Sequence, residues 1–254
     1  MQEIEAYDEG IYFIDQNIPN STGSTLDSLH YFKGYFNYSL KRIDQSIDAF
    51  ERVRASSQTI FIRARFLTAF QHAYSRDYKM ANNLVTLNID TSSFLRELKY
   101  LELASVALLE RNFTGFENYS QGFTGKYYQL ANAEEGLRRN YEGLLKLKRK
   151  SPAVAGLLSG ILPGLGKFYI GKTGEGYLTL LLSTIVGLQV REAYLKDGSN
   201  STRFKIYSGI FTALYVANIW GSVVSVKIYK SEINDTYDEA ILLNMHVPLR
   251  TIFD

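Results

Sequence analysis

Two long stretches without a charged side chain lie in the last third of the chain. They run from Gly176 to Val190 and from Ile206 to Val226, and the second carries Trp220 and two tyrosines. With its amphipathic flanks, each stretch approaches the roughly 20 residues that a helix needs to cross a bilayer core of about 30 Å. The sequence therefore predicts two membrane-spanning helices joined by a short loop.

The overall composition excludes several classes of function. The 254 residues carry a net charge of +2 with no long basic run, which does not favour nucleic-acid binding. There is no cysteine, so disulfides, thiolate metal sites and cysteine nucleophiles are excluded. The stretch from Met1 to Glu5 has neither the basic head nor the apolar core of a signal peptide. Either the membrane helices direct insertion themselves, or a signal peptide has been removed.

The first 150 residues are polar and contain a period of 35 residues. Three sets of positions have this spacing: Gly34, Ala69 and Ala104; Ile43, Tyr78 and Phe113; Ser46, Ala81 and Phe116. A fixed period in the mid-thirties is typical of an array of helix–turn–helix units. We expect a small residue in the first helix of each unit. The second helix should begin at the large residue nine positions later, after a short polar turn.

At these positions the sequence resembles the tetratricopeptide repeat family, over about residues 28–123. The small residue of the first helix corresponds to Gly34, Ala69 and Ala104, and the later aromatic of the second helix to Phe50. The third unit departs from the pattern at Phe116 and Ser120, and the proline that often closes a repeat is missing from all three units. The resemblance implies a helical solenoid.

Helical arrays of this kind usually present a concave groove to a peptide or protein. The candidate groove residues come from the first helix of each unit: Asn37, Tyr38, His72 and Ala107. Sequence gives His72 no acidic partner, so it is interpreted as a groove or packing residue rather than a catalyst. The alternative is that the repeats form only a folded spacer.

The pattern divides the chain into four parts. Residues 1–125 form the repeat domain, 126–150 a capping or linker helix, 151–229 a membrane hairpin and 230–254 a C-terminal tail. The charged amphipathic helix from Tyr127 to Lys150 would cover the last apolar face of the array. The tail has a short amphipathic run before Pro248 and would fold back on the repeats, with His246 on the surface or in packing.

Residues 166–173 satisfy the phosphate-loop pattern G-x-x-x-x-G-K-[ST], with Lys172 and Thr173 in the phosphate and magnesium positions. Such a loop joins a buried strand to a helix, whereas here Pro163 and Gly164 interrupt the preceding segment. The following helix is apolar on all sides, which suits lipid better than a sheet. Nucleotide binding through Gly166–Thr173 is therefore only a remote alternative.

A different resemblance covers about residues 151–229. The stretch from Ser151 to Gly171, followed by a glycine-interrupted apolar pair, is similar to the two-transmembrane (TM-two) domain proteins and their bacterial relatives. Seven residues carry the match and are called the membrane motif below: Pro163, Gly164, Gly166, Phe168, Tyr169, Gly171 and Gly176. The resemblance implies a membrane hairpin and no enzymatic activity. The interrupted segment before it should be interfacial or re-entrant, with its broken backbone covered by protein.

Small residues recur four apart on the second apolar stretch, at Gly209, Ala213, Ala217 and Gly221. This spacing lets helix backbones approach closely, so the face they form should pack within the hairpin or against a protein partner. Asn218 lies in the same apolar zone, where an unpaired amide is costly. It either bonds across the helix pair or contacts a partner.

These patterns predict an all-α, non-catalytic protein without a cofactor, metal or small-molecule substrate. The leading hypothesis is a membrane-anchored scaffold whose repeats bind a protein partner at the lipid bilayer; the alternative is an integral subunit that docks into a larger complex through its hairpin. Basic residues flank both ends of the hairpin, so the positive-inside rule leans towards cytoplasmic repeats. The resemblance to bacterial relatives of the TM-two proteins implies a bacterial inner-membrane protein. A removed signal peptide would make the repeats periplasmic.

Overall fold

The structure, a computed structural model, describes residues 2–87 and 92–253. Over these residues it contains helices and turns and no strand, which confirms the predicted all-α class. The chain forms two compact units. Unit 1 comprises Met1–Leu145 together with Tyr237–Asp254, and unit 2 comprises Lys146–Thr236.

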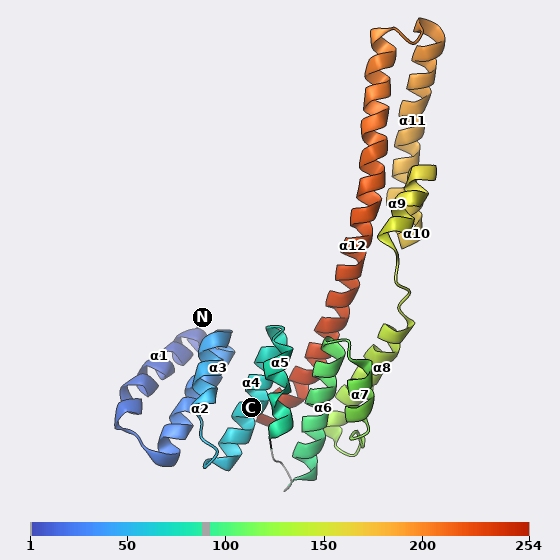
Figure 1. Cartoon of the computed structure of the whole chain (residues 1–254). Helices are drawn as coiled ribbons and strands as arrows, with labels where there is room; N and C mark the ends of the chain where they lie inside the picture. Colours follow the sequence, from blue (N-terminus) through green and yellow to red (C-terminus); the bar gives the residue numbers. More distant parts are fainter. Residues whose placement is uncertain (1, 88–91, 254) are drawn as a thin grey trace. The chain divides into compact units, whose positions relative to one another are not determined.

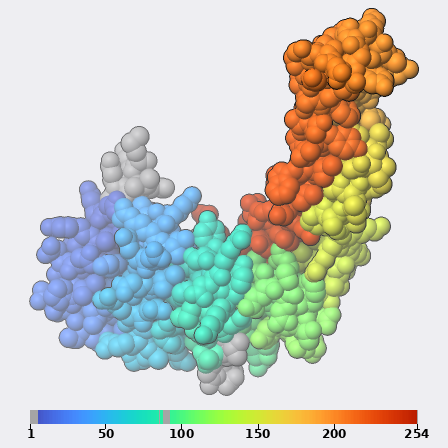
Figure 2. All heavy atoms as spheres, turned by 45° about the horizontal axis from the view of Figure 1, so that its top comes forward, coloured from blue at the N-terminus to red at the C-terminus, as the bar shows by residue number. Residues whose placement is uncertain are grey.

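Three helices of equal length organise unit 1. These are α2 (Gly23–Ser39), α4 (Gln58–Tyr74) and α6 (Ser93–Leu109), each of 17 residues. Each packs on the short helix that follows it: α3 (Ile43–Glu51), α5 (Tyr78–Ala81) and α7 (Phe113–Ser120). These three short helices begin at the residues that the 35-residue period predicts. Within unit 1 the hairpins follow one another side by side in chain order (Figures 1 and 2).

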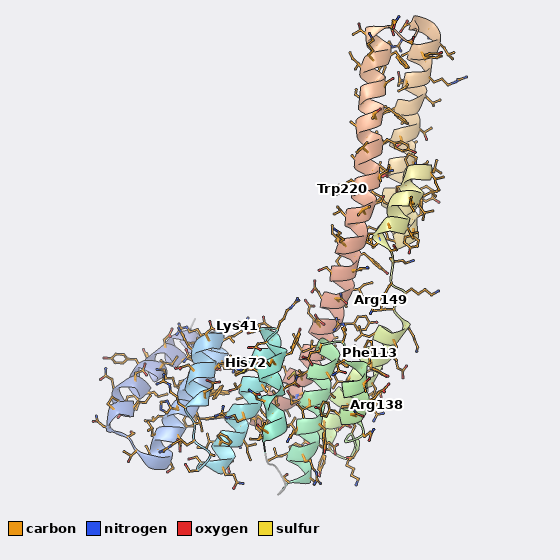
Figure 3. The ribbon with its side chains drawn as sticks, viewed as in Figure 1. Lys41, His72, Phe113, Arg138, Arg149 and Trp220 are labelled. Carbon is orange, nitrogen blue, oxygen red and sulfur yellow. The ribbon has the colours of Figure 1, made fainter. Side chains whose placement is uncertain are left out.

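The turns inside the three hairpins also repeat. Lys41, Arg76 and Arg111 have φ values of 59°, 63° and 59°, in the left-handed region that non-glycine residues rarely adopt. In each turn the next residue donates its amide hydrogen to a carbonyl five positions earlier, from Arg42 to Asn37, Asp77 to His72 and Asn112 to Ala107, all at 2.8 Å. The bond gives an otherwise unpaired carbonyl at the helix end a donor. Lys41, His72 and Phe113 mark the three turns in Figure 3.

The small residues of the period allow close packing within a hairpin. A Cβ on Gly34 would fall 2.5 Å from the ring of Phe50, so only glycine leaves room for that ring. The hydroxyl of Ser46 donates to the carbonyl of Gly34 at 2.8 Å. The second hairpin departs from this plan, because α5 has only four residues and continues as a 3-10 helix, η2 (Asn82–Thr86).

Unit 1 is completed by helices at both ends. The first hairpin is preceded by α1 (Gln2–Asn17) and the 3-10 turn η1 (Ile18–Asn20), and the last is followed by α8 (Tyr128–Lys146). Helix α8 ends at Lys146, before the basic residues 148–150 and four residues short of the predicted end.

Unit 2 contains α9 (Pro152–Ile161), α10 (Leu165–Ile170), α11 (Thr173–Asp197) and the first part of α12 (Thr202–Phe253). Helices α11 and α12 are long and apolar enough to cross a membrane, and only 11% and 17% of their apolar windows are buried in the protein. At about 1.5 Å per residue, the 25 residues of α11 extend about 37 Å. The prediction of two candidate membrane-spanning helices is thus confirmed.

Helix α12 is longer than the sequence predicts. It continues without interruption beyond residue 229 and through Pro248 to Phe253. The predicted start of the tail at residue 230 falls within this helix: residues up to 236 belong to unit 2, and those from 237 belong to unit 1.

Candidate functional site

The last turns of α12, residues 237–253, form an amphipathic segment that packs on unit 1 and is called the C-terminal segment below. Ile241, Met245 and Leu249 have no exposed surface, and Phe253 is 6% exposed. Residues four apart lie on one face of a helix. On the other face, Leu243 is 61% exposed and Val247 is 51% exposed. The segment therefore lies on unit 1 along one face only.

Aromatic side chains from two first helices hold one end of this segment. The imidazole of His246 stacks on the ring of Phe70, with centroids 4.7 Å apart, and hydrogen-bonds to the hydroxyl of Tyr38 through Nε2. One turn before Phe70, Phe66 packs against Phe253 at a centroid distance of 5.8 Å. Residues on α2 and α4 therefore bind side chains from the same amphipathic helix.

The other end of the segment contacts the turn before α7 and helix α8. Arg111 forms an ion pair with Asp238 at 2.8 Å. A Cβ on Gly136 would fall 2.3 Å from the side-chain oxygen of Asn244, and a Cβ on Gly143 would fall 2.4 Å from the hydroxyl of Tyr237. The two glycines let the segment approach α8 closely. We call the contacting set, Tyr38, Phe66, Phe70, Arg111, Gly136 and Gly143, the receiving face.

The structure places the four candidate groove residues in two settings. Tyr38 contacts the C-terminal segment. Asn37 and Ala107 are 2% and 3% exposed, and their carbonyls close the hairpin turns. His72 closes the middle turn in the same way, and its ring lines an open trough of about 650 Å³ beside Thr68. Binding of a partner at these residues stays a prediction.

Sequence reasoning missed Phe66, Phe70 and His246. Their signal was weak: Phe66 and Phe70 are four apart, and the 35-residue period aligns them with Tyr31 and Tyr35. A lone histidine near the chain's end gave no indication that it would stack on either.

Unit 2 has a second candidate site, where the backbone breaks between α9 and α10. Gly164 has a φ of 94°, and a Cβ there would fall 2.4 Å from the carbonyl oxygen of Gly176. Asn218 from α12 bridges the break, because its side-chain oxygen accepts from the amide of Gly164 at 3.2 Å while its nitrogen donates to the carbonyl of Ser159 at 3.2 Å. Asn218 thus bonds to the backbone on both sides of the break, and contact with a partner stays a prediction.

Two buried hydroxyls extend this polar cluster. The hydroxyl of Ser159 accepts from the amide of Gly166 at 3.0 Å and lies 2.7 Å from the hydroxyl of Ser222. A Cβ on Gly166 would fall 2.2 Å from the carbonyl oxygen of Ala155. Backbone polar groups away from water need such partners, so the cluster makes the broken helix tolerable in an apolar environment.

The remaining membrane-motif residues build the same corner. Pro163 is buried, Gly171 ends α10 with a φ of 90°, and the ring of Phe168 covers Gly176. The hydroxyl of Tyr169 accepts from the amide of Ser151 at 3.1 Å, and the ammonium of Lys150 lies 4.6 Å from its ring centroid. The seven residues of the motif therefore lie in one connected structure.

The small residues on α12 have a different environment. Gly209, Ala213 and Ala217 are exposed and Gly221 is partly exposed, and no atom lies within 4 Å of a Cβ added to either glycine. The first three line an open surface with Ser208, Thr212, Val216 and Trp220, the last of which is 70% exposed (Figure 3). Packing of this face within the hairpin is therefore not observed.

The phosphate-loop pattern at Gly166–Thr173 does not form an anion cradle. The amides of Gly171 and Lys172 donate to the carbonyls of Phe168 and Lys167, both at 3.0 Å. The ammonium of Lys172 lies 3.8 Å from Glu175. The amides that would bind phosphate are therefore used in helix ends. Within the described residues, no three His, Asp or Glu side chains converge as metal ligands.

Buried carboxyl groups fix two turns of unit 1. Asp27 accepts from the guanidinium of Arg54 at 2.9 Å and from the hydroxyl of Ser57 at 2.5 Å, and its bond to Arg54 lowers its pKa to about 2. Glu134 accepts from the amide of Gly125 at 3.0 Å. Burial, and then the adjacent Glu97 carboxyl, raise the pKa of Glu134 to about 7. These groups hold turns together and face no obvious reaction centre.

No protein-family model matches the chain, and no curated protein or solved structure matches it either.

Proposed function

We propose that this chain is a membrane-anchored, non-catalytic scaffold in which a tetratricopeptide-like solenoid binds a protein partner at the membrane. Helices α11 and α12 would insert as a hairpin, and the polar cluster around Asn218 would support the broken segment α9–α10 inside it. The anchor would raise the local concentration of whatever unit 1 binds.

The observation that carries the binding role is the C-terminal segment itself. Its row of three fully buried apolar residues lies on unit 1, with Tyr38 and Phe70 on His246. Helix-in-groove recognition uses the same arrangement, in which anchors three or four apart enter an apolar surface. This contact supports a unit 1 surface suited to an amphipathic helix.

The exposed surfaces of α11 and α12 support the anchoring role. Leu178, Leu181 and Leu188 on α11 are 66%, 59% and 58% exposed. A continuous apolar surface of this extent on a soluble protein would promote aggregation, whereas lipid would satisfy it. The basic residues near both ends of the hairpin favour cytoplasmic repeats.

A second candidate function is that of an integral subunit. The observation that favours it is the open face at Gly209, Ala213 and Ala217, which no residue of unit 2 covers. Small residues four apart let a second transmembrane helix approach closely.

Alkaline extraction of membranes from cells that express the full chain tests the anchor. The protein should stay with the lipid and require detergent for release. Its recovery as a monodisperse species without detergent would overturn the proposal.

Photo-crosslinking in the same membranes separates scaffold from subunit. A crosslinking amino acid at Tyr74, which is 57% exposed on α4, should give a discrete adduct with a second protein if unit 1 recruits a partner. An adduct only from Ala213 on α12 would favour the subunit. Tyr128, which is 85% exposed on α8, is the control position outside both faces.

A further inference from the structure

The receiving face already holds a helix, which specifies what kind of partner fits it. The C-terminal segment presents an acid, Asp238, then apolar residues at four-residue intervals, and an aromatic ring at the far end, Phe253. The receiving face complements this pattern. The guanidinium of Arg111 pairs with the acid, two glycines on α8 allow close approach of the helix, and the rings of Phe66 and Phe70 contact its aromatic side chains.

We propose that the partner of unit 1 is a protein carrying an amphipathic helix of this same pattern, and that its helix binds the receiving face by displacing residues 237–253. The inference rests on the proposed scaffold function and adds the chemistry of the partner and the way in which it binds.

Two features of the contact make exchange physically reasonable. The segment covers the receiving face from one side and leaves Leu243 and Val247 in the open, so it can leave without passing through the array. Pro248 lies within it, and because proline has no amide hydrogen the helix loses one backbone bond there. The segment's own helix is thus weakened at Pro248.

The receiving face also has support that does not involve the segment. The hairpins α2–α3, α4–α5 and α6–α7 pack within themselves, through contacts such as Phe50 on Gly34. Asp27 ties α2 to the turn before α4 through Arg54 and Ser57. An incoming helix would therefore meet helices that are already arranged.

Competition by the resident segment makes a quantitative prediction. A partner helix can bind only those molecules whose receiving face is open. Its apparent dissociation constant therefore equals the intrinsic constant divided by the open fraction. Because the segment is tethered, its effective concentration is high. Weakening the segment should therefore tighten binding of a helix added in solution.

The probe is a fluorescent peptide of residues 235–254, measured by anisotropy against the full-length protein in detergent micelles. The first variant is Ile241→Asp with Met245→Asp, which changes only the segment and leaves the receiving face intact. Leu243→Asp is the control, because it places an aspartate on the exposed face of the same helix. The double variant should bind the peptide at least about tenfold more tightly than the control.

Peptides and empty micelles provide the remaining controls. A peptide with both aspartates should not bind, and a peptide with Leu243→Asp should bind like the parent. Signal from protein-free micelles is subtracted. If the double variant keeps its helical circular dichroism and binds the peptide no better than Leu243→Asp, the displacement proposal is overturned.

A reversible lock keeps the test decisive if the double variant fails to fold. A Cβ on Gly136 lies 2.8 Å from the Cγ of Asn244, so the two Cβ atoms are at most about 4.3 Å apart. Disulfides need about 3.5–4.5 Å between these atoms. Gly136→Cys with Asn244→Cys should therefore form a disulfide, and the chain has no other cysteine to compete.

The probe for this pair is the peptide with Asn244→Ala, because a side chain at position 136 would occupy the space of the Asn244 amide. The oxidised pair should abolish binding of this peptide, and reduction should restore it. Equal binding in both redox states, or none in either, would overturn the proposal. Neither result affects membrane extraction or crosslinking from Tyr74, so failure of this inference is distinguishable from failure of the scaffold function.

Discussion

The imidazole of His246 lies nearly parallel to the ring of Phe70, with 12° between the ring planes and 4.7 Å between their centroids. These residues are 176 positions apart in the chain, and their contact brings the end of α12 onto α4. Tyr38 meets the same imidazole edge-on from α2. One histidine thus connects two hairpins of unit 1 to the C-terminal segment.

Phe70→Ala should destabilise unit 1 by about 3 kcal/mol, because a buried phenyl ring is removed and a cavity is left beside His246. The matched control is Tyr74→Ala, one turn along the same helix, whose ring is 57% exposed. It should cost less than about 1 kcal/mol. Chemical unfolding in detergent micelles, followed by circular dichroism, measures both. Equal losses for the two variants would contradict the packing described for Phe70.

Much of unit 1 could be predicted from sequence because its signals are local and periodic. Helices begin as expected at Ile43, Tyr78 and Phe113, since each of these large residues follows a short polar turn. The turns depend on a positive φ at Lys41, Arg76 and Arg111. Because lysine and arginine rarely adopt this conformation, their presence in the sequence does not indicate it. Their spacing of 35 residues becomes evident only in the structure.

The C-terminal segment could not be placed from one sequence. Its four-residue spacing from Ile241 to Phe253 indicates an amphipathic helix, but not which surface covers it. Proline removes a backbone bond and usually breaks a helix, yet α12 continues through Pro248. The burial of Leu249 and Phe253 beyond it compensates for that loss. Long-range packing therefore overrides a strong local signal here.

Gly166→Ala should disrupt the corner of unit 2. Its new Cβ would lie 2.2 Å from the carbonyl oxygen of Ala155, a backbone atom that cannot rotate away. We expect a loss of at least about 2 kcal/mol, as for other overpacked sites. Gly209→Ala is the control on α12, where nothing lies within 4 Å of the added methyl. Because alanine favours a helix over glycine, that variant should be neutral or up to about 1 kcal/mol more stable.

Thermal unfolding of the two glycine variants in the same detergent provides the comparison. If Gly166→Ala has the same melting temperature as the wild type, then α9 and α10 are not packed as closely as described. A loss in Gly209→Ala would instead show that the face at Gly209 is covered.

Asn218→Leu should destabilise unit 2 by about 2–4 kcal/mol, because it removes the side-chain oxygen and nitrogen that make the two hydrogen bonds at the break between α9 and α10. The amide of Gly164 and the carbonyl of Ser159 would then be buried without a hydrogen bond, at about 1–3 kcal/mol each. Thr212→Val on the same helix is the control, since its exposed hydroxyl bonds only within α12. It should change stability by less than about 0.5 kcal/mol. A neutral Asn218→Leu would mean that this amide does not hold the hairpin.

The membrane-motif glycines were identified from sequence, but the polar partners that fix them were not. Pro163 and Gly164 signal a helix break in any context. Ser159 and Ser222 are 63 residues apart, and nothing local indicates that their hydroxyls meet at 2.7 Å. An unpaired amide is costly in an apolar zone, so the sequence indicates that Asn218 needs hydrogen-bond partners. It does not indicate which groups they are.

The stability of unit 1 should depend on pH through Glu134. Its pKa is about 7 in the folded chain and about 4.5 when exposed, so the folded state retains a proton over this interval that the unfolded state has lost. The contribution of Glu134 is therefore fully favourable below pH 4.5, declines as pH rises to 7 and stays constant above it. At about 1.4 kcal/mol for each unit of pKa this interval corresponds to at most about 3.5 kcal/mol, and screening by solvent reduces the expected decline to about 2 kcal/mol.

Glu134→Gln removes this dependence, because the amide is neutral at every pH and can still accept from Gly125. The variant should match the wild type near pH 5 and exceed it by about 2 kcal/mol at pH 8. Glu135→Gln is the control, since Glu135 is the adjacent carboxylate and is exposed beside Arg139; it should keep the slope of the wild type. Asp27 does not interfere with the measurement. Because its pKa is lowered, its contribution to the stability of unit 1 is lost only as pH falls from about 4 to about 2. Melting curves at pH 5, 6, 7 and 8 test the expectation, and a Glu134→Gln slope equal to that of Glu135→Gln would refute a buried, protonated Glu134.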